Sequence, residues 1–561
     1  MHPISLRSII LALTMTLLLQ TSDFAFAQQA GRGAGPGFGP GAGLAATTLT
    51  IFETDDFSGS GICALCHSRL TDEAGTDVSN DAQWRSTMMA NAAKDPLWQA
   101  KISAEVFLAS ANPEAKSLIE EKCSRCHMGM ARYQAKTDGT AVGVFTPGFL
   151  DPAHYLHEAA MDGVSCTLCH QIQPDNLGTP DSFTGKYVID TATAPPNRLI
   201  FGPYDQPRQN PMQNNAGFLP MPGTQIADSA HCGSCHTLYT PALDENGDLI
   251  GYEFPEQTTY LEWEHSGVLE TCQDCHLPKA VGSVVISNRP PTLAARSPFW
   301  QHHYVGGNSF MVNLLKANAA TLGVTADDVH FDGTISRTLT QLGQDTAVLT
   351  ASASRTGDAL SVTVDVENLA GHKLPSGLPS RRCWLHMVVT DANQNLIFES
   401  GKPLPDGRIA GNDAEDADPS TYEFHYKTIT SDDQVQIYEP IMLTYEGEVT
   451  YTLLRAYSYA KDNRLLPAGF DKVNALGDIA VYGLAVDDAN FTGGSDRVTY
   501  QIDVAGAKGN LNVTVKLLYQ TLSYPFVSDL ANTKTDLVND FMSLYNPADN
   551  VPVVLARAQI P

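Results

Sequence analysis

The pattern Cys-x-x-Cys-His occurs five times in this chain, and no other feature restricts its possible folds as strongly. Ten of the 11 cysteines belong to these copies. In chain order the motifs are Cys63, Cys66 and His67; Cys123, Cys126 and His127; Cys166, Cys169 and His170; Cys232, Cys235 and His236; and Cys272, Cys275 and His276. Two thiols at this spacing can bind the two vinyl groups of one haem covalently, and the next histidine then lies beneath the iron. The sequence therefore predicts five c-type haems, with the cysteines as anchors and the histidines as proximal ligands.

Zinc is the main alternative for such cysteines. A zinc site built from Cys-x-x-Cys units takes cysteines from two motifs for each metal ion. Five motifs cannot be paired in this way, and a histidine directly after the second cysteine is typical of haem attachment. Cys383 is the one cysteine outside the motifs, and it is predicted to be a buried free thiol in a strand.

The N-terminus predicts export. Arg7 precedes an apolar run at residues 9–19, and the sequence Ala-Phe-Ala at 25–27 is typical of a signal-peptide cleavage site before Gln28. The apolar run is too short for a membrane span, and no later segment approaches about 18 uninterrupted apolar residues. We therefore expect a signal peptide at 1–27, no integral membrane segment after cleavage, and a periplasmic or extracellular protein.

The charge of the chain limits its partners. The sequence has 62 acidic and 35 Lys or Arg residues, which leaves a formal net charge of −27. Nucleic acid is excluded as a partner because its phosphates would be repelled. The acidity favours basic redox partner proteins, although an acidic surface that only keeps the protein soluble is the alternative.

The pattern of residues divides the chain into regions. A Gly-rich linker is expected at 28–48, and residues 49–343 hold all five motifs among short helices and long Pro- and Gly-rich loops. Residues 344–561 instead alternate with the period of strands, which predicts an antiparallel β-sandwich-like domain with a C-terminal tail. At 561 residues the chain exceeds what one hydrophobic core normally supports. The predicted fold class is α+β with two domains.

Several local elements can also be predicted. Asn112 and Pro113 are suited to the start of a helix that leads to the second motif. Asp391 to Asn395 is predicted to be a hairpin turn, and 536–545 the only helix after residue 345. Residues 202–223 contain so many Pro and Gly residues that no regular element is expected there.

The haem region resembles a known group of proteins. The motifs in their contexts "GVSCTLCH" and "AHCGSCH", and "LEWEHSG" before "CQDCH", resemble the multihaem c-type cytochromes of the cytochrome c554-like superfamily. The C-terminal half, with "GHKLPSGLPSRRCWLHMVVTD", resembles a β domain appended in some larger multihaem cytochromes. This resemblance implies closely stacked low-spin haems that relay electrons. Enzymes of the group usually keep one haem with an open or unusual axial position, such as lysine in place of the motif histidine. All five motifs here end in histidine, which argues against catalysis but leaves an open distal side conceivable.

A haem that only transfers electrons generally has a second axial ligand. No histidine lies between the first and second motifs, so the first haem needs a distant histidine or a methionine. The candidate distal ligands are Met88, Met89, His154, His157, His265, His302, His303 and His372. Core packing is the alternative for the methionines, and structural hydrogen bonding is the alternative for the histidines. His154 and His157 would share a helix face, and His372 begins a loop of the predicted β domain that could cap a haem.

The leading functional prediction is an exported pentahaem cytochrome that relays single electrons between redox partners in the cell envelope or extracellular space. One alternative is a multihaem oxidoreductase that acts on a small nitrogen or sulfur compound at a five-coordinate haem. The other is a subunit of a conducting filament, in which a neighbour completes a haem. Separately, an acidic loop with Asp413, Glu415, Asp416 and Asp418 offers oxygen ligands for calcium, with a merely solvated loop as the alternative.

Overall fold

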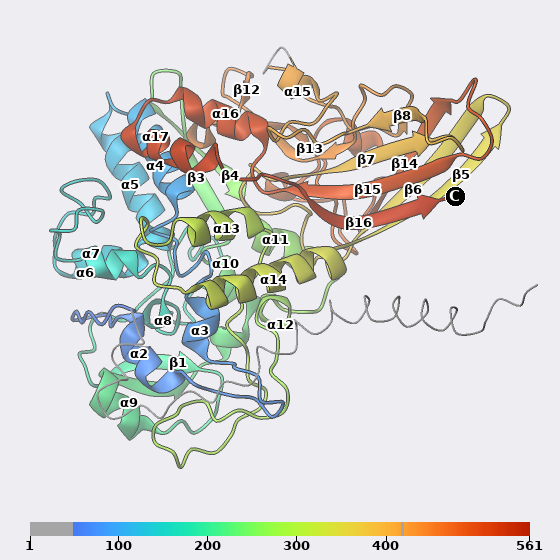
Figure 1. Cartoon of the computed structure of the whole chain (residues 1–561). Helices are drawn as coiled ribbons and strands as arrows, with labels where there is room; N and C mark the ends of the chain where they lie inside the picture. Colours follow the sequence, from blue (N-terminus) through green and yellow to red (C-terminus); the bar gives the residue numbers. More distant parts are fainter. Residues whose placement is uncertain (1–48, 417–419) are drawn as a thin grey trace, which may run out of the picture. The chain divides into compact units, whose positions relative to one another are not determined.

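The structure is a computed structural model that describes residues 49–416 and 420–561. The predicted signal peptide and linker, at 1–27 and 28–48, lie outside the described residues. Residues 49–561 form one compact unit of the α+β class, with short helices in its first part and several sheets in its second (Figure 1). The division into two domains at residue 343 stays a prediction. None of the described helices is long and apolar enough to span a membrane.

Every motif includes residues of a short helix. These helices are α2 (Ser60–His67), α5 (Pro113–His127), α8 (Cys166–Cys169), α10 (Ser229–Gly233) and α12 (Cys272–His276). The other elements of this part are α3 (Asn80–Trp84), α4 (Pro96–Leu108), α6 (Gly129–Thr137), α7 (His157–Met161), β1 (Arg198–Gly202), α9 (Gln209–Ala216), β2 (Phe218–Pro222), the 3-10 helix η1 (Thr224–Ala227), β3 (Leu238–Leu243), β4 (Leu249–Gln257) and α11 (Thr259–Glu264). Long loops connect these elements, as the Pro- and Gly-rich sequence predicts.

The start of α5 confirms the predicted helix before the second motif. The side chain of Asn112 accepts hydrogen bonds from the backbone N–H groups of Glu114 and Ala115, both at 3.1 Å. Pro113 occupies the first helical position, where the missing N–H costs nothing. The helix continues through the motif to His127, so it carries both cysteines of the second motif.

The prediction that 202–223 contains no regular element is wrong. Helix α9 and strand β2 lie in this segment, and β2 pairs in parallel with β1. Pro211 is tolerated because it lies in the first turn of α9, where backbone N–H groups have no partner within the helix. Gly217 then ends the helix with a φ of 75°, a left-handed conformation that favours glycine.

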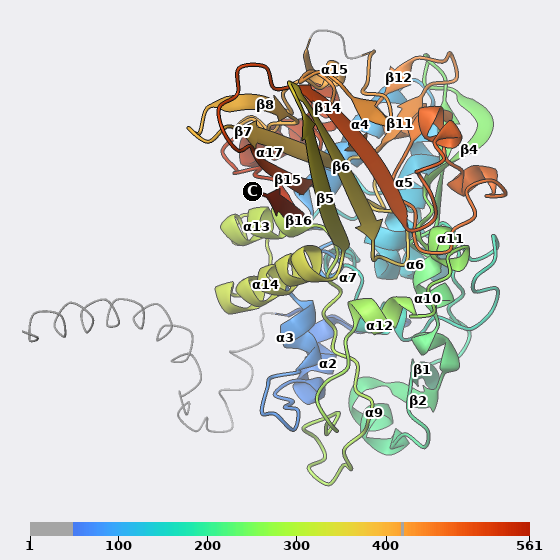
Figure 2. The ribbon, with the colours of Figure 1, turned by 90° about the vertical axis from the view of Figure 1, so that its right-hand side faces the viewer.

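Three sheets make up most of the second part. The first has the order β5 (Ala347–Thr356), β6 (Ala359–Asn368), β14 (Ser495–Asp503) and β9 (Thr428–Ile429); Figure 2 shows β5, β6 and β14 side by side. The second has the order β10 (Ile437–Tyr438), β7 (Arg382–Thr390), β15 (Asn512–Gln520) and β16 (Val553–Ile560), with β8 (Leu396–Ser400) also paired to β7. The third contains β12 (Val449–Thr450), β11 (Pro440–Leu443) and β13 (Ser458–Asp462). The strands pair antiparallel in all three, except that β9 lies parallel to β14.

The two larger sheets share one hydrophobic core. Val362, Val364 and Val366 of β6 are buried in the same cluster as Leu385 and Met387 of β7. The alternation of buried and exposed residues along β6 follows the two-residue period of a strand. Cys383 is also buried in β7 as a free thiol, which confirms its prediction. The turn between β7 and β8 is confirmed as well, and the Asp391 carboxylate holds it by accepting from the backbone of Asn393 and Asn395.

Helices also lie on and between the sheets. They are α13 (Ser309–Ala317), α14 (Asp328–Gln344), α15 (Asp413–Asp416), η2 (Leu453–Arg455), η3 (Gly477–Ile479), η4 (Gly483–Asp487), α16 (Tyr524–Asn532) and α17 (Asp536–Tyr545). Helix α17 confirms its prediction, but α15 and α16 show that it is not the only helix after residue 345. In α16, Pro525 lies within the first turn, where proline does not interrupt a helix. Helix α17 packs against α4, so the end of the chain contacts the motif region.

Candidate functional site

All five motifs line one large cavity. Its volume is about 2310 Å³, and each of the ten motif cysteines and five motif histidines contributes to its wall. Sites for a single small molecule usually measure about 300–1,000 Å³. The cavity is therefore large enough for several ligands, and its wall presents five equal sets of two thiols and one imidazole. This is the donor set that five c-type haems require.

Local hydrogen bonds hold the motif helices in place. Asp162, four residues before the third motif, accepts from both the backbone N–H and the hydroxyl of Ser60, at 2.9 and 2.7 Å. Ser60 begins α2, so the approach to the third motif caps the helix of the first. At the fifth motif, Thr271 and Asp274 form a reciprocal capping box at the start of α12. These contacts fix the starts of α2 and α12.

Cysteines of different motifs approach one another. A hydrogen bond to the Cys166 thiol and burial raise the pKa of Cys63 well above its usual value. In the same way, a hydrogen bond to Cys235 and burial raise the pKa of Cys126. The contacts place the first motif beside the third and the second beside the fourth.

The fourth motif also contacts the fifth. A hydrogen bond to the Cys272 thiol and burial raise the pKa of Cys232, and α10 packs against α12. The third motif lies near the fourth, because burial and then the charge of Cys235 raise the pKa of Cys169 to about 12. The five motifs therefore form one connected set.

Most of the five motif histidines, which are predicted to be proximal ligands, have the hydrogen bonding that suits a metal ligand. Four of them donate from Nδ1 to a backbone carbonyl: His67 to Ile286 at 2.8 Å, His127 to Ala92 at 3.0 Å, His170 to Phe201 at 2.6 Å and His276 to Val305 at 2.6 Å. This bond fixes the tautomer and leaves Nε2 free for a metal. Burial lowers the pKa of all five histidines, to about 4 for His127 and His236. They are therefore neutral at neutral pH, which is the form that binds iron.

Two of the proximal histidines face a second histidine. The ring centroids of His170 and His302 lie 6.4 Å apart with an interplanar angle of 24°, and those of His276 and His372 lie 6.5 Å apart at 10°. Two imidazoles on opposite sides of one iron, each with a metal–nitrogen bond of about 2 Å, have centroids about 6.4 Å apart. Both pairs match this separation. Within 49–416 and 420–561, no histidine ring faces His67, His127 or His236 in this way.

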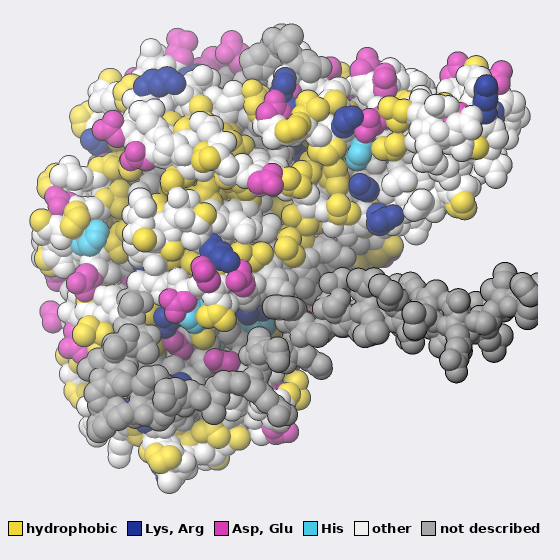
Figure 3. All heavy atoms as spheres, in the orientation of Figure 1, with side chains coloured by type: hydrophobic (Ala, Val, Ile, Leu, Met, Phe, Trp, Pro, Cys, Tyr) yellow, Lys and Arg dark blue, Asp and Glu magenta, His cyan; other side chains and the backbone are white. Residues whose placement is uncertain are grey.

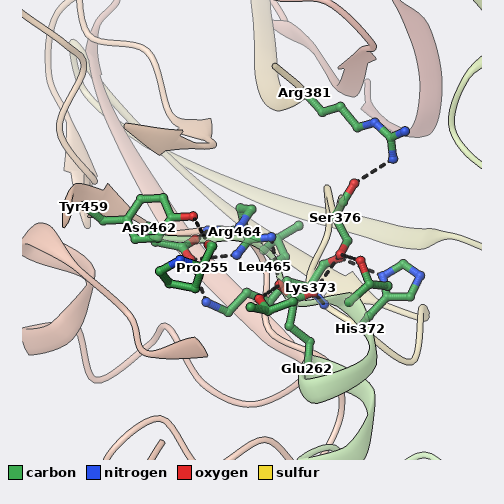
Figure 4. Close-up of polar contacts among 12 residues, drawn as sticks. Pro255, Glu262, His372, Lys373, Ser376, Arg381, Tyr459, Asp462, Arg464 and Leu465 are labelled. Atoms are coloured by element: carbon green, nitrogen blue, oxygen red, sulfur yellow. Dashed lines mark hydrogen bonds and ion pairs between the residues drawn. The ribbon is translucent and has the colours of Figure 1, made fainter. Parts of the chain in front are cut away.

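The segment that carries His372 is held by buried polar contacts (Figure 4). His372 donates from Nδ1 to the carbonyl of Lys373 at 2.9 Å. The next residues contact Glu262 of α11, whose carboxylate accepts from the Lys373 backbone N–H at 3.1 Å and from the Ser376 hydroxyl at 2.7 Å. The structure thus connects a loop of the strand-rich part to a helix that lies between the fourth and fifth motifs.

The other predicted distal ligands differ in position. Met88, Met89 and His303 line the cavity together with His302 and His372. His154, His157 and His265 do not line it. His157 begins α7 and donates to the carbonyl of Phe149 at 2.9 Å, while His154 lies outside the helix, so the two do not share a helix face. Their ligation of iron stays a prediction.

Sequence reasoning did not select two further residues at this site. His231 lines the cavity, and its Nδ1 is buried with no hydrogen-bond partner among the described residues. Glu262 is fully buried, and its role depends on a contact with residues more than a hundred positions away. The position of His231 next to a motif is the only sequence signal that could have indicated its place at the site. Nothing near Glu262 in the sequence indicates its role.

A cluster of His425, Asp488 and Asp496 in the strand-rich part has ligand atoms close enough for a metal ion. Its hydrogen bonds do not fit one. Nδ1 of His425 accepts from the amide groups of Gln436 at 2.9 Å and Asn463 at 3.1 Å, and both amide oxygens are engaged by backbone N–H groups, which fixes their orientation. The ring proton is therefore on Nε2, where it faces Asp488 at 3.2 Å. A metal-bound histidine would instead donate from its second nitrogen, so we interpret the cluster as a structural network.

The acidic loop proposed for calcium is partly occupied by other contacts. Glu415 is buried and forms an ion pair with Arg382, and its second oxygen accepts from the backbone of Ile409. Asp413 and Asp416 bound the short helix α15, and Asp418 lies outside the described residues. Calcium stays a prediction. On the face shown in Figure 3, acidic side chains are spread over the surface among Lys and Arg side chains.

Comparison with known proteins yields little. No family model matches the chain, and no curated protein matches it. Among solved structures, a penta-heme cytochrome c552 from Thermochromatium tepidum is similar, with 17% identity and a TM-score of 0.49 over 90% of this chain and 98% of that chain. A similarity this low does not by itself assign a fold or a function.

Proposed function

We propose that this chain is an exported pentahaem c-type cytochrome that relays single electrons between redox partners in the cell envelope or extracellular space. The observation that carries the proposal is the common cavity, whose wall contains all five Cys-x-x-Cys-His motifs. Bound haem iron would supply the redox chemistry by alternating between its ferrous and ferric states. The protein supplies the anchors, the axial ligands and the shielding from water.

The side chains divide these tasks among themselves. The two cysteines of each motif would hold a porphyrin by thioether bonds, and the motif histidine would bind its iron through Nε2. The carbonyl acceptors on His67, His127, His170 and His276 fix the rings and raise their basicity as ligands. Because the histidines are buried and neutral, iron binding does not have to displace a proton from them at neutral pH.

We assign two distal ligands from the ring geometry. His302 is the proposed second ligand of the third-motif haem, opposite His170, and His372 is that of the fifth-motif haem, opposite His276. Bis-histidine ligation fills both axial positions and suits a haem that exchanges electrons without binding substrate. Met88, Met89, His231 and His303 line the cavity and are the candidates for the remaining irons.

The contacts between motifs support an order for the haems. Helix α2 of the first motif packs against α8 of the third, α10 of the fourth packs against α12 of the fifth, and Cys169 of the third lies near Cys235 of the fourth. The second motif contacts the fourth. We therefore propose a path through the first, third, fourth and fifth haems, with the second haem beside the fourth. The acidic surface favours basic redox proteins as partners at the ends of this path.

The oxidoreductase alternative is supported by one observation. Within the described ranges, no histidine ring faces His67, His127 or His236 at the separation of an axial pair, so one of these haems could keep an open position. The filament alternative would fill such a position with a histidine from a neighbouring chain.

A redox titration distinguishes the electron carrier from the enzyme. We expect all five haems to be reduced and reoxidised reversibly, with low-spin spectra that nitrite and hydroxylamine do not change, because a haem that only carries electrons has both axial positions filled. The measurement is the visible absorption of the purified protein at controlled potentials. A high-spin signal that shifts with either compound would favour the oxidoreductase instead.

A further inference from the structure

We infer that Glu262 is a positioning residue that holds His372 against the iron of the fifth-motif haem. The inference rests on the proposed function, because it requires His372 to be a ligand. His372 belongs to a loop between β6 and β7, whereas the proximal ligand His276 belongs to the motif region. The two rings can face one another at 6.5 Å only if the loop is fixed against the motif region. Glu262 makes that connection.

The carboxylate of Glu262 is fully occupied. One oxygen, Oε2, accepts from the backbone N–H of Lys373 at 3.1 Å and from the hydroxyl of Ser376 at 2.7 Å. The other, Oε1, accepts from Thr258 at 3.2 Å and pairs with Arg464 at 2.9 Å. Lys373 and Ser376 lie at the two ends of the short stretch that follows His372. Both ends of this stretch are therefore bonded to one side chain of α11.

The charges around Glu262 balance. Two buried acids, Glu262 and Asp462, face two buried bases, Lys373 and Arg464. The Lys373 ammonium donates to Asp462 at 2.7 Å, while its backbone N–H donates to Glu262. Removing the charge of Glu262 leaves a surplus positive charge in a dry interior, which is costly. The loop can relieve this cost by moving away from α11, and His372 would then leave the iron.

The loop has further support on its other side. Leu374 and Leu465 exchange backbone hydrogen bonds of 2.9 Å, and Asn368 donates to the carbonyl of His372 at 2.9 Å. These contacts tie the loop to the strand-rich part but not to the motif region. Thr259 of α11 also lies 2.9 Å from the Ser376 hydroxyl. Thr259 and Glu262 thus supply the polar contacts between the loop and the motif region, while Gly371 packs beside Trp263 and Val268.

The test compares Glu262→Gln with Glu264→Gln in the haem-loaded full chain. Glu264 lies on the same helix but is exposed, and its one bond within the described part of the chain is to Tyr260, so it is a matched control. For Glu262→Gln we expect at least about tenfold faster carbon monoxide binding to one of the reduced haems, because hydrogen bonds to a charged group are among the stronger ones in proteins. We also expect faster hydrogen exchange in residues 371–377. Both readouts should be unchanged in Glu264→Gln.

Two further variants keep the outcomes distinct. His372→Ala should open the same haem completely; if it opens none, the ligand assignment itself fails. If His372→Ala opens a haem while Glu262→Gln binds carbon monoxide and exchanges hydrogen like the unaltered protein, the positioning role of Glu262 is wrong. Ser376→Ala removes the contacts of this hydroxyl with Glu262 and Thr259 without leaving a surplus buried charge, and it should show a smaller increase in both rates. If Glu262→Gln does not fold, Ser376→Ala is the deciding variant. Unchanged rates of carbon monoxide binding and hydrogen exchange in Ser376→Ala would then overturn the inference.

Discussion

His372→Ala is expected to convert one haem of this protein from a six-coordinate low-spin to a five-coordinate high-spin state. The ring of His372 faces that of the proximal ligand His276 at the separation of two imidazoles on one iron. Alanine leaves a gap on the distal side that no other histidine of the described part is placed to fill. Electron paramagnetic resonance and visible absorption of the oxidised protein measure the change, and added imidazole should restore the low-spin signal by occupying the gap.

The control for this variant is His386→Ala. His386 lies on β7, bonds Glu399 at 3.0 Å and does not line the cavity, so its loss should leave all haems low-spin. His302→Ala should open a different haem, the one bound at the third motif. If His372→Ala keeps every haem low-spin, the assignment of His372 as a ligand is wrong, and the contact between the strand-rich part and the fifth motif has only a structural role.

Asp462→Asn is expected to cause the largest loss of stability, about 3–5 kcal/mol of the free energy of unfolding. The Asp462 carboxylate accepts from Lys373 at 2.7 Å and from Arg464 at 2.8 and 2.9 Å, and all three side chains are buried. An amide in its place leaves two buried cations opposite Glu262 alone. Denaturant unfolding of the haem-loaded protein, followed by circular dichroism, measures the loss.

An exposed ion pair provides the comparison. Asp365 pairs with Arg497 at 2.6 Å on the surface of the first sheet, so Asp365→Asn should cost at most about 1 kcal/mol. Equal losses of unfolding free energy in the two variants would show that burial of the Asp462 cluster does not increase its contribution to stability.

The stability should also depend on pH through Asp462. Burial acts to raise the pKa of Asp462, but Arg464 and Lys373 hold this pKa far below its usual range. The stabilisation is therefore complete at neutral pH and is lost in acid, below about pH 4.

The elements that could be predicted from the sequence are those with local signals. The five motifs, the cap at Asn112, the turn after β7 and the alternation of β6 each follow from residues within a few positions. Helix α9 was missed because its prolines and glycine suggested a loop, whereas Pro211 and Gly217 lie at positions that a helix tolerates. Composition over a window does not show where in a helix a proline lies.

The distal side of the site depends on long-range contacts, and the sequence could not rank its candidates. His154 and His265 lie closer in sequence to a motif than His372 does, yet of these three only His372 lines the cavity and faces a motif histidine. What distinguishes His372 is that the next residue, Lys373, is bonded to Glu262 of α11, more than a hundred positions away. Such pairs become visible only when the chain is folded.

The central claim is that five haems are bound covalently, and the mass of the intact protein tests it most directly. The chain should be produced in a host that attaches c-type haem, purified under denaturing conditions and weighed by mass spectrometry. We expect the mass of the chain without its signal peptide plus that of five haems, because each motif has both cysteines and the histidine in the wall of the cavity. Changing both cysteines of one motif to alanine should remove one haem. A bare polypeptide, which a zinc protein would also give under denaturing conditions, would contradict the account.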